Sequence, residues 1–128
     1  MPQWEIPIQV RFGDTDMMGH LNNAAYVQYL ELARLHVAAE MERSGLPRVY
    51  TVLAHLEMDY RREVHFGQEV RVRIWTERVG SSSWQLGCAV DADGQLAAEG
   101  KTVQVCIDPE TRRPSPISGR VRSYLEGS

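Results

Sequence analysis

One long segment, from Asn23 to Arg43, constrains the fold of this chain more than any other feature. Apolar residues recur every three or four positions, as on a helix, and no Gly or Pro interrupts them. The recurring positions are Ala24, Val27, Leu30 or Glu31, Ala33 or Arg34, and Val37 or Ala38. Asn22 or Asn23 suits the N-cap, and "SGLP" is expected to end the helix. Because this predicted helix is apolar around most of its circumference, other elements must wrap it.

Alternating apolar residues predict five strands around this helix. The first covers residues 3–12, with Trp4, Ile6, Ile8, Val10 and Phe12 on one face. The second lies within residues 50–64, with Val52, Ala54, Leu56 and Met58 on one face. The other three cover residues 69–79, 83–90 and 95–107. The apolar face of the strand at 69–79 consists of Val70, Val72 and Ile74, and that of the strand at 83–90 consists of Trp84, Leu86, Cys88 and Val90.

Turn signals fix how the last strands connect. "DADG" predicts a hairpin, and Gly100 is expected at a bulge or a bend. One helical turn is expected near "RVRSYL" in the tail. One helix across one curved antiparallel sheet is an α+β fold, and residues 1–128 form a single domain. Since a single sheet covers only part of so apolar a helix, we expect a homodimer that joins two sheets edge to edge.

Composition excludes several classes of partner. The net charge of −3 and the pI near 5.8 argue against nucleic acid, whose phosphates require clustered positive charge. No apolar run approaches the ~18 residues of a membrane span, and "MPQWEIPIQV" does not resemble a secretory signal. Cys88 and Cys106 lack metal-ligand spacing, and the hairpin places Cys88 opposite roughly residue 99. We therefore expect reduced thiols and a cytoplasmic protein.

Three segments resemble one known family. "DTDMMGHLNNAAYVQYLELAR", "DYRREVHFGQEVRVRIWTERVGSSSWQL" and "AAEGKTVQVCID" are similar to hotdog-fold acyl-CoA thioesterases of the 4-hydroxybenzoyl-CoA thioesterase type, over roughly residues 5–125. The resemblance implies a central helix wrapped by a five-stranded sheet, and a homodimer that often pairs into a homotetramer. It also implies hydrolysis of acyl-CoA to free acid and CoA, without a cofactor.

Two loop acids are the candidates for this chemistry. In an extended loop Asp14 and Asp16 point the same way, which does not suit the facing pair of a glycosidase. Thioester hydrolysis needs one carboxylate, to activate water or attack the carbonyl carbon, and donors for the oxyanion. The resemblance assigns that carboxylate to Asp16, as base or nucleophile. Alternatively both acids cap turns or pair with Arg11 and Arg34, the role we expect for Asp14.

The start of the helix supplies the other candidates. The N–H of Asn23 or a neighbour can hold the oxyanion, and Gly19 lets the loop backbone approach a ligand, or is a plain turn glycine. Relatives with a "HANY" loop carry His at the position of Asn23, whereas this chain has His20 earlier. His20 therefore orients the loop or contacts substrate, and the Asn23 side chain is a cap or a donor. Tyr26 is expected to pack at the pocket.

Cations and hydroxyls are needed for the CoA phosphates. We expect Arg61, Ser82 and Ser83 to contact them, with Arg62, Arg78 and Ser81 as further candidates. Glu31 and Arg34, three apart on the helix, are expected to form a structural ion pair.

No metal is expected at the loop. "DTDMMGH" offers oxygen donors and one imidazole but lacks a further well-placed ligand, and His36, His55 and His65 could contribute only through the fold. Two other functions compete with hydrolysis. A non-catalytic acyl-CoA-binding module is the main alternative, and a dehydratase of 3-hydroxyacyl thioesters fits the "DTD" and "GHLNN" arrangement poorly.

Overall fold

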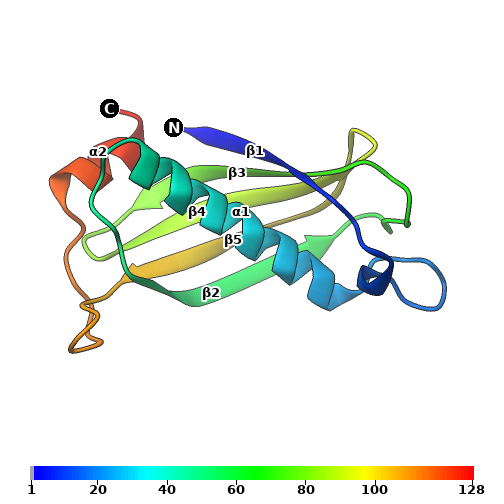
Figure 1. Cartoon of the computed structure of the whole chain (residues 1–128), viewed down its shortest axis with the longest axis horizontal. Coiled ribbons are helices and arrows are strands. Elements are labelled where there is room, and N and C mark those ends of the chain that lie inside the picture. Colours follow the sequence, from blue (N-terminus) through cyan, green and yellow to red (C-terminus); the bar gives the residue numbers. More distant parts are fainter. Residues whose placement is uncertain (1) are drawn as a thin grey trace.

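The fold is one sheet with a long helix across its face, as Figure 1 shows for this computed structural model, which describes residues 2–128. The elements are β1 (Gln3–Ile8), the 3-10 turn η1 (Phe12–Asp14), α1 (Asn23–Arg43), β2 (Thr51–Tyr60), β3 (Val70–Val79), β4 (Ser83–Ala92), β5 (Gln95–Cys106) and α2 (Gly119–Glu126). The five strands pair antiparallel in the order β1-β3-β4-β5-β2. The predicted α+β architecture is confirmed.

Helix α1 has the predicted bounds and buries one stripe of its surface. Its cap is Asn22, whose side chain accepts a hydrogen bond from the Ala25 N–H at 2.8 Å. The buried stripe consists of Ala25, Tyr26, Tyr29, Leu30, Ala33, Val37 and Met41. Ala24, expected in the stripe, is exposed, because the stripe starts one position later. Leu32 and Leu35 are 52% and 60% exposed, so within one chain the helix is wrapped on one side only.

The central strands present the predicted apolar faces to α1. Val70, Val72 and Ile74 of β3 are buried, and so are Trp84, Leu86, Cys88 and Val90 of β4. Strand β1, however, ends at Ile8 rather than at residue 12. Ile8 pairs with Val70, where β3 begins, so the chain has no strand partner beyond it. Phe12 instead lies in η1 and is 81% exposed.

Strand β2 differs from the predicted pattern because of a bulge. The register shifts between Leu53 and His55, so Ala54 has no partner in β5. Leu53 and Leu56 pair with two buried residues of β5, Gln104 and Thr102. Directly paired residues share a face of the sheet, so Leu53 lies on the side of α1 and Val52 on the other side. The prediction that Val52 shares the face of Leu56 is therefore wrong, and the bulge at Ala54 interrupts the predicted alternation.

Gly100 permits a close approach of two strands. It pairs in register with Met58 and Cys88, so no bulge lies there, and the shift between β4 and β5 falls between Val90 and Asp91. A Cβ atom at Gly100 would collide with the backbone carbonyl of Glu57. Cys88 thus faces residue 100, close to the expected position.

The tail and the thiols complete the fold. Helix α2 spans eight residues, longer than the single turn expected, because Ser118 caps it and Val121 and Leu125 are buried. Both cysteines are free, as expected. Among residues 2–128, neither helix has the length and apolar character needed to cross a membrane.

We predict that Gly100→Ala lowers the free energy of unfolding by about 1–3 kcal/mol, because the new methyl group overpacks the β2–β5 contact. Urea denaturation measures the change. Gly119→Ala is the control, since a Cβ there meets no atom within 4 Å. An equal effect of the two substitutions would contradict the close approach.

Candidate functional site

A pocket lies at the N-terminal end of α1, where the loop of residues 11–22 meets residues 61–66. Backbone hydrogen bonds join the two segments, from Leu21 N–H to Val64 O at 2.7 Å and from Phe66 N–H to Gly19 O at 3.0 Å. The pocket has a volume of about 330 Å³ and is lined by Asp16, His20, Leu21, Asn23, Tyr26, Tyr60, Arg61, Arg62 and Glu63. It brings together five predicted site residues, namely Asp16, His20, Asn23, Tyr26 and Arg61.

One carboxylate oxygen of Asp16 is hydrogen-bonded to the loop backbone, and in the part of the chain that the structure describes the other has no hydrogen-bond donor. Its Oδ1 accepts hydrogen bonds from the N–H groups of Met18 at 2.9 Å and His20 at 3.1 Å. Within residues 2–128, no hydrogen-bond donor contacts Oδ2. The pKa of Asp16 is lowered, chiefly because the His20 N–H binds the carboxylate. Asp16 is therefore ionised at neutral pH, with a free oxygen at the pocket.

Asp14 is held inside the protein and takes no part in the pocket. Its side chain is buried and accepts hydrogen bonds from the Arg11 N–H at 3.0 Å, the Arg11 guanidinium at 3.0 Å and the Tyr29 hydroxyl at 2.7 Å. Burial raises the pKa of Asp14, but these hydrogen bonds outweigh it and lower the pKa overall. The expectation that Asp14 and Asp16 point the same way is wrong, because Asp14 ends η1 and is drawn inward.

The first turn of α1 borders the pocket through Asn23. Since Asn22 is the N-cap, Asn23 is the first helical residue, and its exposed side chain lines the pocket rather than capping the helix. The first N–H groups of a helix lack intrahelical acceptors and carry the positive end of the dipole. Gly19 does not line the pocket. Its φ of 79° allows the tight turn between Asp16 and His20.

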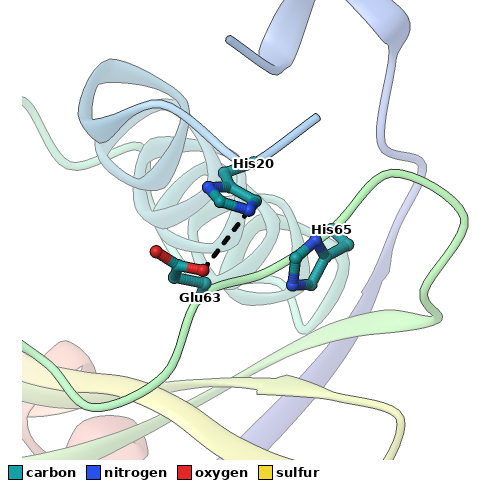
Figure 2. A group of neighbouring side chains, drawn as sticks. All are labelled: His20, Glu63 and His65. Atoms are coloured by element: carbon teal, nitrogen blue, oxygen red, sulfur yellow. Dashed lines mark ion pairs between the residues drawn. The ribbon is translucent and has the colours of Figure 1, made fainter. Parts of the chain in front are cut away.

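His20 lies beside two residues that the motif did not predict at the site, Glu63 and His65 (Figure 2). His20 Nε2 is 3.3 Å from a carboxylate oxygen of Glu63. The rings of His20 and His65 meet edge to face, with centroids 4.6 Å apart. The two histidines are opposed in an isolated antiparallel bridge, a pairing between distant segments that no local sequence pattern signals.

Two aromatic rings form the inner wall of the pocket. Tyr26 is buried, and its ring meets that of Tyr60 at 5.0 Å between centroids. Burial raises the pKa of the Tyr26 hydroxyl, so it stays protonated near neutral pH. Tyr60 was missed because nothing in the sequence shows that the end of β2 reaches this helix turn.

The candidate CoA-binding residues lie at both ends of the sheet. Arg61 is 3.8 Å from both Asp59 and Glu99, whereas no carboxylate within residues 2–128 pairs with Arg62. Ser82 lies in the turn between β3 and β4, and Ser83 is the first residue of β4. This turn is at the opposite end of the sheet from the start of α1 (Figure 1). One chain therefore does not bring these serines to Asp16.

The expected ion pair on α1 is present. Arg34 contacts Glu31 at 2.7 Å and also donates to the Thr51 hydroxyl at 3.2 Å. Glu31 and Arg34 thus tie α1 to the start of β2, and Arg34 does not contact the loop acids.

We predict that Asp14→Asn lowers the free energy of unfolding by about 1–3 kcal/mol at neutral pH, because it weakens charge-assisted hydrogen bonds in the interior. The folded pKa of Asp14 lies below the unfolded value of about 3.9, so the carboxylate stabilises the fold above that value. This contribution disappears as the pH falls through the folded pKa, and the mutant and wild type should then converge. Urea denaturation over a pH series measures the difference, with the exposed Glu110→Gln as control.

Several proteins of similar sequence and fold are named as thioesterases or acyl-CoA hydrolases. Residues 10–125 match the thioesterase-like superfamily. A 1,4-dihydroxy-2-naphthoyl-CoA hydrolase of Synechococcus sp. strain CC9605 is 30% identical over 140 residues, covering 99% of this chain and 92% of that protein. The long-chain acyl-CoA thioesterase FadM of Escherichia coli K12 is 26% identical over 124 residues, covering 93% and 94%.

A solved structure gives the same result. The thioesterase of Thermus thermophilus, complexed with coenzyme A and Zn, superposes with a TM-score of 0.84 at 34% identity, over 97% of this chain and 94% of that one. The hotdog fold and the thioesterase class predicted from the sequence are confirmed. The chain belongs to the thioesterase-like superfamily.

Proposed function

We propose that the protein hydrolyses acyl-CoA thioesters to free acid and CoA in the pocket at the start of α1. The observation that carries this proposal is the ionised Asp16, with Oδ2 free, in the same pocket as the first turn of α1. The named activities of the Synechococcus and Escherichia coli relatives support an acyl-CoA substrate, and so does the coenzyme A in the Thermus thermophilus structure.

The Asp16 carboxylate acts on the carbonyl carbon of the thioester. As a general base it takes a proton from water while the water oxygen attacks that carbon. As a nucleophile it attacks directly, and water then hydrolyses the mixed anhydride. In both routes the C–S bond breaks and the CoA sulfur leaves as a thiolate that gains a proton. The hydrogen bonds of Oδ1 hold the side chain to the loop and leave Oδ2 available for this reaction.

The start of α1 stabilises the negative charge that develops on the carbonyl oxygen. The N–H groups of Asn23 and its neighbour Ala24 stand at the positive end of the helix dipole. Such fixed donors act on charge that appears only in the transition state, so they accelerate the reaction itself. The Asn23 side-chain amide adds a donor, and His20 and Tyr26 bound the space for the thioester.

A second copy of the chain completes the CoA site. Strand β2 is an edge of the sheet, with Val52 and Leu53 still 39% and 37% exposed on its two faces. Pairing of two β2 strands about a two-fold axis would run them antiparallel. The start of one β2 would then lie near the end of the other. Ser82 and Ser83 of the second copy would approach the pocket, where Arg61 and Arg62 meet the CoA phosphates.

The two thiols support a reducing compartment. Cys88 and Cys106 are free, and burial raises the pKa of Cys88 to about 12, so it stays an unreactive thiol. Proteins of oxidising compartments use such residues in disulfides. We therefore place the activity in the cytoplasm.

We predict that Asp16→Asn lowers kcat/KM for CoA thioesters by about 10²–10⁴-fold, the usual contribution of a positioned proton-transfer group. Thiol release from aliphatic and aryl CoA thioesters measures it. Asn keeps a side-chain oxygen that can accept the Met18 and His20 N–H groups, so the loop should persist. Asp108→Asn is a matched control, because Asp108 likewise accepts two backbone N–H groups with one oxygen.

Equal activity of the Asp16→Asn variant and wild type would contradict the catalytic role of Asp16. Tight acyl-CoA binding by folded wild type without any turnover would instead favour the non-catalytic binding module.

We predict that Leu53→Glu dissociates the homodimer and lowers activity, because it places a charge on the β2 edge that the dimer buries. Sedimentation velocity and thiol release measure the two effects. Leu32→Glu, at an exposed leucine on the outer face of α1, is the control and should leave the dimer intact. Dissociation by Leu32→Glu alone would place the dimer contact on the helix, whereas loss only of a larger assembly would indicate a homotetramer built on that face.

A further inference from the structure

We propose that His20, Glu63 and His65 form a binding site for one divalent transition-metal ion, with Zn²⁺ as the best fit. The three side chains come from two segments that the fold brings together beside the pocket (Figure 2). The proposal goes beyond the proposed function, since it concerns ion binding and not the thioester step, but the two sites share His20 and Glu63.

The spacing of the donor atoms suits a metal ion. His20 Nε2 and a Glu63 oxygen are 3.3 Å apart, and one donor atom from each of the three residues lies within 4.8 Å of the others. Two ligands of a tetrahedral Zn²⁺ with bonds of about 2.0–2.1 Å lie roughly 3.3 Å from each other. The first pair already has this separation, and a closer approach of the His65 donor atom would complete the set.

The donor set selects the class of ion. Two imidazoles and one carboxylate are typical of Zn²⁺ sites with an open position for water, whereas Ca²⁺ and Mg²⁺ prefer oxygen ligands. The Glu63 side chain is 67% exposed and that of His20 is 23% exposed, so an ion can reach the site from solvent.

The backbone holds the ligands in place before an ion binds. His20 and His65 are opposed in an antiparallel bridge, flanked by hydrogen bonds from Leu21 to Val64 and from Phe66 to Gly19. The Asp16 N–H donates to the His20 carbonyl at 2.8 Å, and the His20 N–H donates to the Asp16 carboxylate at 3.1 Å. A bound ion would therefore fasten the Asp16 loop to residues 61–66.

Within residues 2–128, no other His–Glu pair belongs to such a group of three ligands. His55 is 3.2 Å from Glu57, a similar distance, but the third group on that carboxylate is the cation Lys101 at 3.5 Å. A cation in the third position opposes a metal ion, so the His55 pair is a matched negative control.

The test is titration of tag-free, chelator-treated protein with ZnCl₂ by isothermal calorimetry, and with Co²⁺ by visible absorption. We expect one ion per chain, about 10- to 100-fold weaker binding in His65→Gln and Glu63→Gln, and unchanged binding in His55→Gln. Zn²⁺ should also raise the melting temperature of wild type but not of His65→Gln, because it binds only the folded site.

Two results would overturn the site, namely the absence of saturable binding by folded wild type, or equal weakening by His65→Gln and His55→Gln. Thiol release measured with EDTA separates this proposal from the enzyme mechanism. Continued hydrolysis in EDTA, with Zn²⁺ binding intact in its absence, supports an accessory ion. Loss of hydrolysis that Zn²⁺ restores would overturn the accessory role.

Discussion

The buried carboxylate of Asp14 is the interaction on which the site depends. A charged group inside a protein is costly unless it is paired and hydrogen-bonded, and Arg11 and Tyr29 together supply three donors to it. Tyr29 belongs to α1, so this contact fixes the loop against the helix. The backbone carbonyl of Asp14 accepts the Asn22 N–H at 3.0 Å, which joins the same residue to the N-cap. The position of Asp16 follows from this anchor.

Two aspartates of the same motif thus have different roles because their surroundings differ. Both have a lowered pKa, and both accept backbone N–H groups, so charge alone does not distinguish them. Both oxygens of Asp14 accept hydrogen bonds inside the protein, whereas Asp16 is exposed and uses one oxygen to hold its turn. A carboxylate can react only through an oxygen that substrate or water can reach, so the proposed chemistry falls to Asp16.

Local periodicity predicted the elements but not the contacts between distant segments. The helix from Asn23 to Arg43 and the apolar faces of β3 and β4 follow from spacing within each segment. The bulge at Ala54 changes which residues of β2 face α1. The apolar pattern does not reveal this bulge, because Val52 and Ala54 are both apolar and continue the alternation without a break. The bridge between His20 and His65 depends on chain positions 45 residues apart, which only the folded sheet determines. The motif therefore predicted the residues before α1 and missed their neighbours Tyr60, Glu63 and His65.

Within one chain the candidate CoA-binding residues lie too far apart to form one site. The start of α1 and the turn between β3 and β4 are at opposite ends of the sheet (Figure 1). No movement of a loop can therefore join the pocket at the start of α1 to Ser82 and Ser83. The proposed two-fold axis beside β2 would exchange those ends, because it would reverse the direction of the partner strand. The same axis would cover Leu53, which lies on the side of α1 but remains exposed at the sheet edge. In the proposed dimer, burial of the edge and assembly of the CoA site would thus be two consequences of a single symmetric contact.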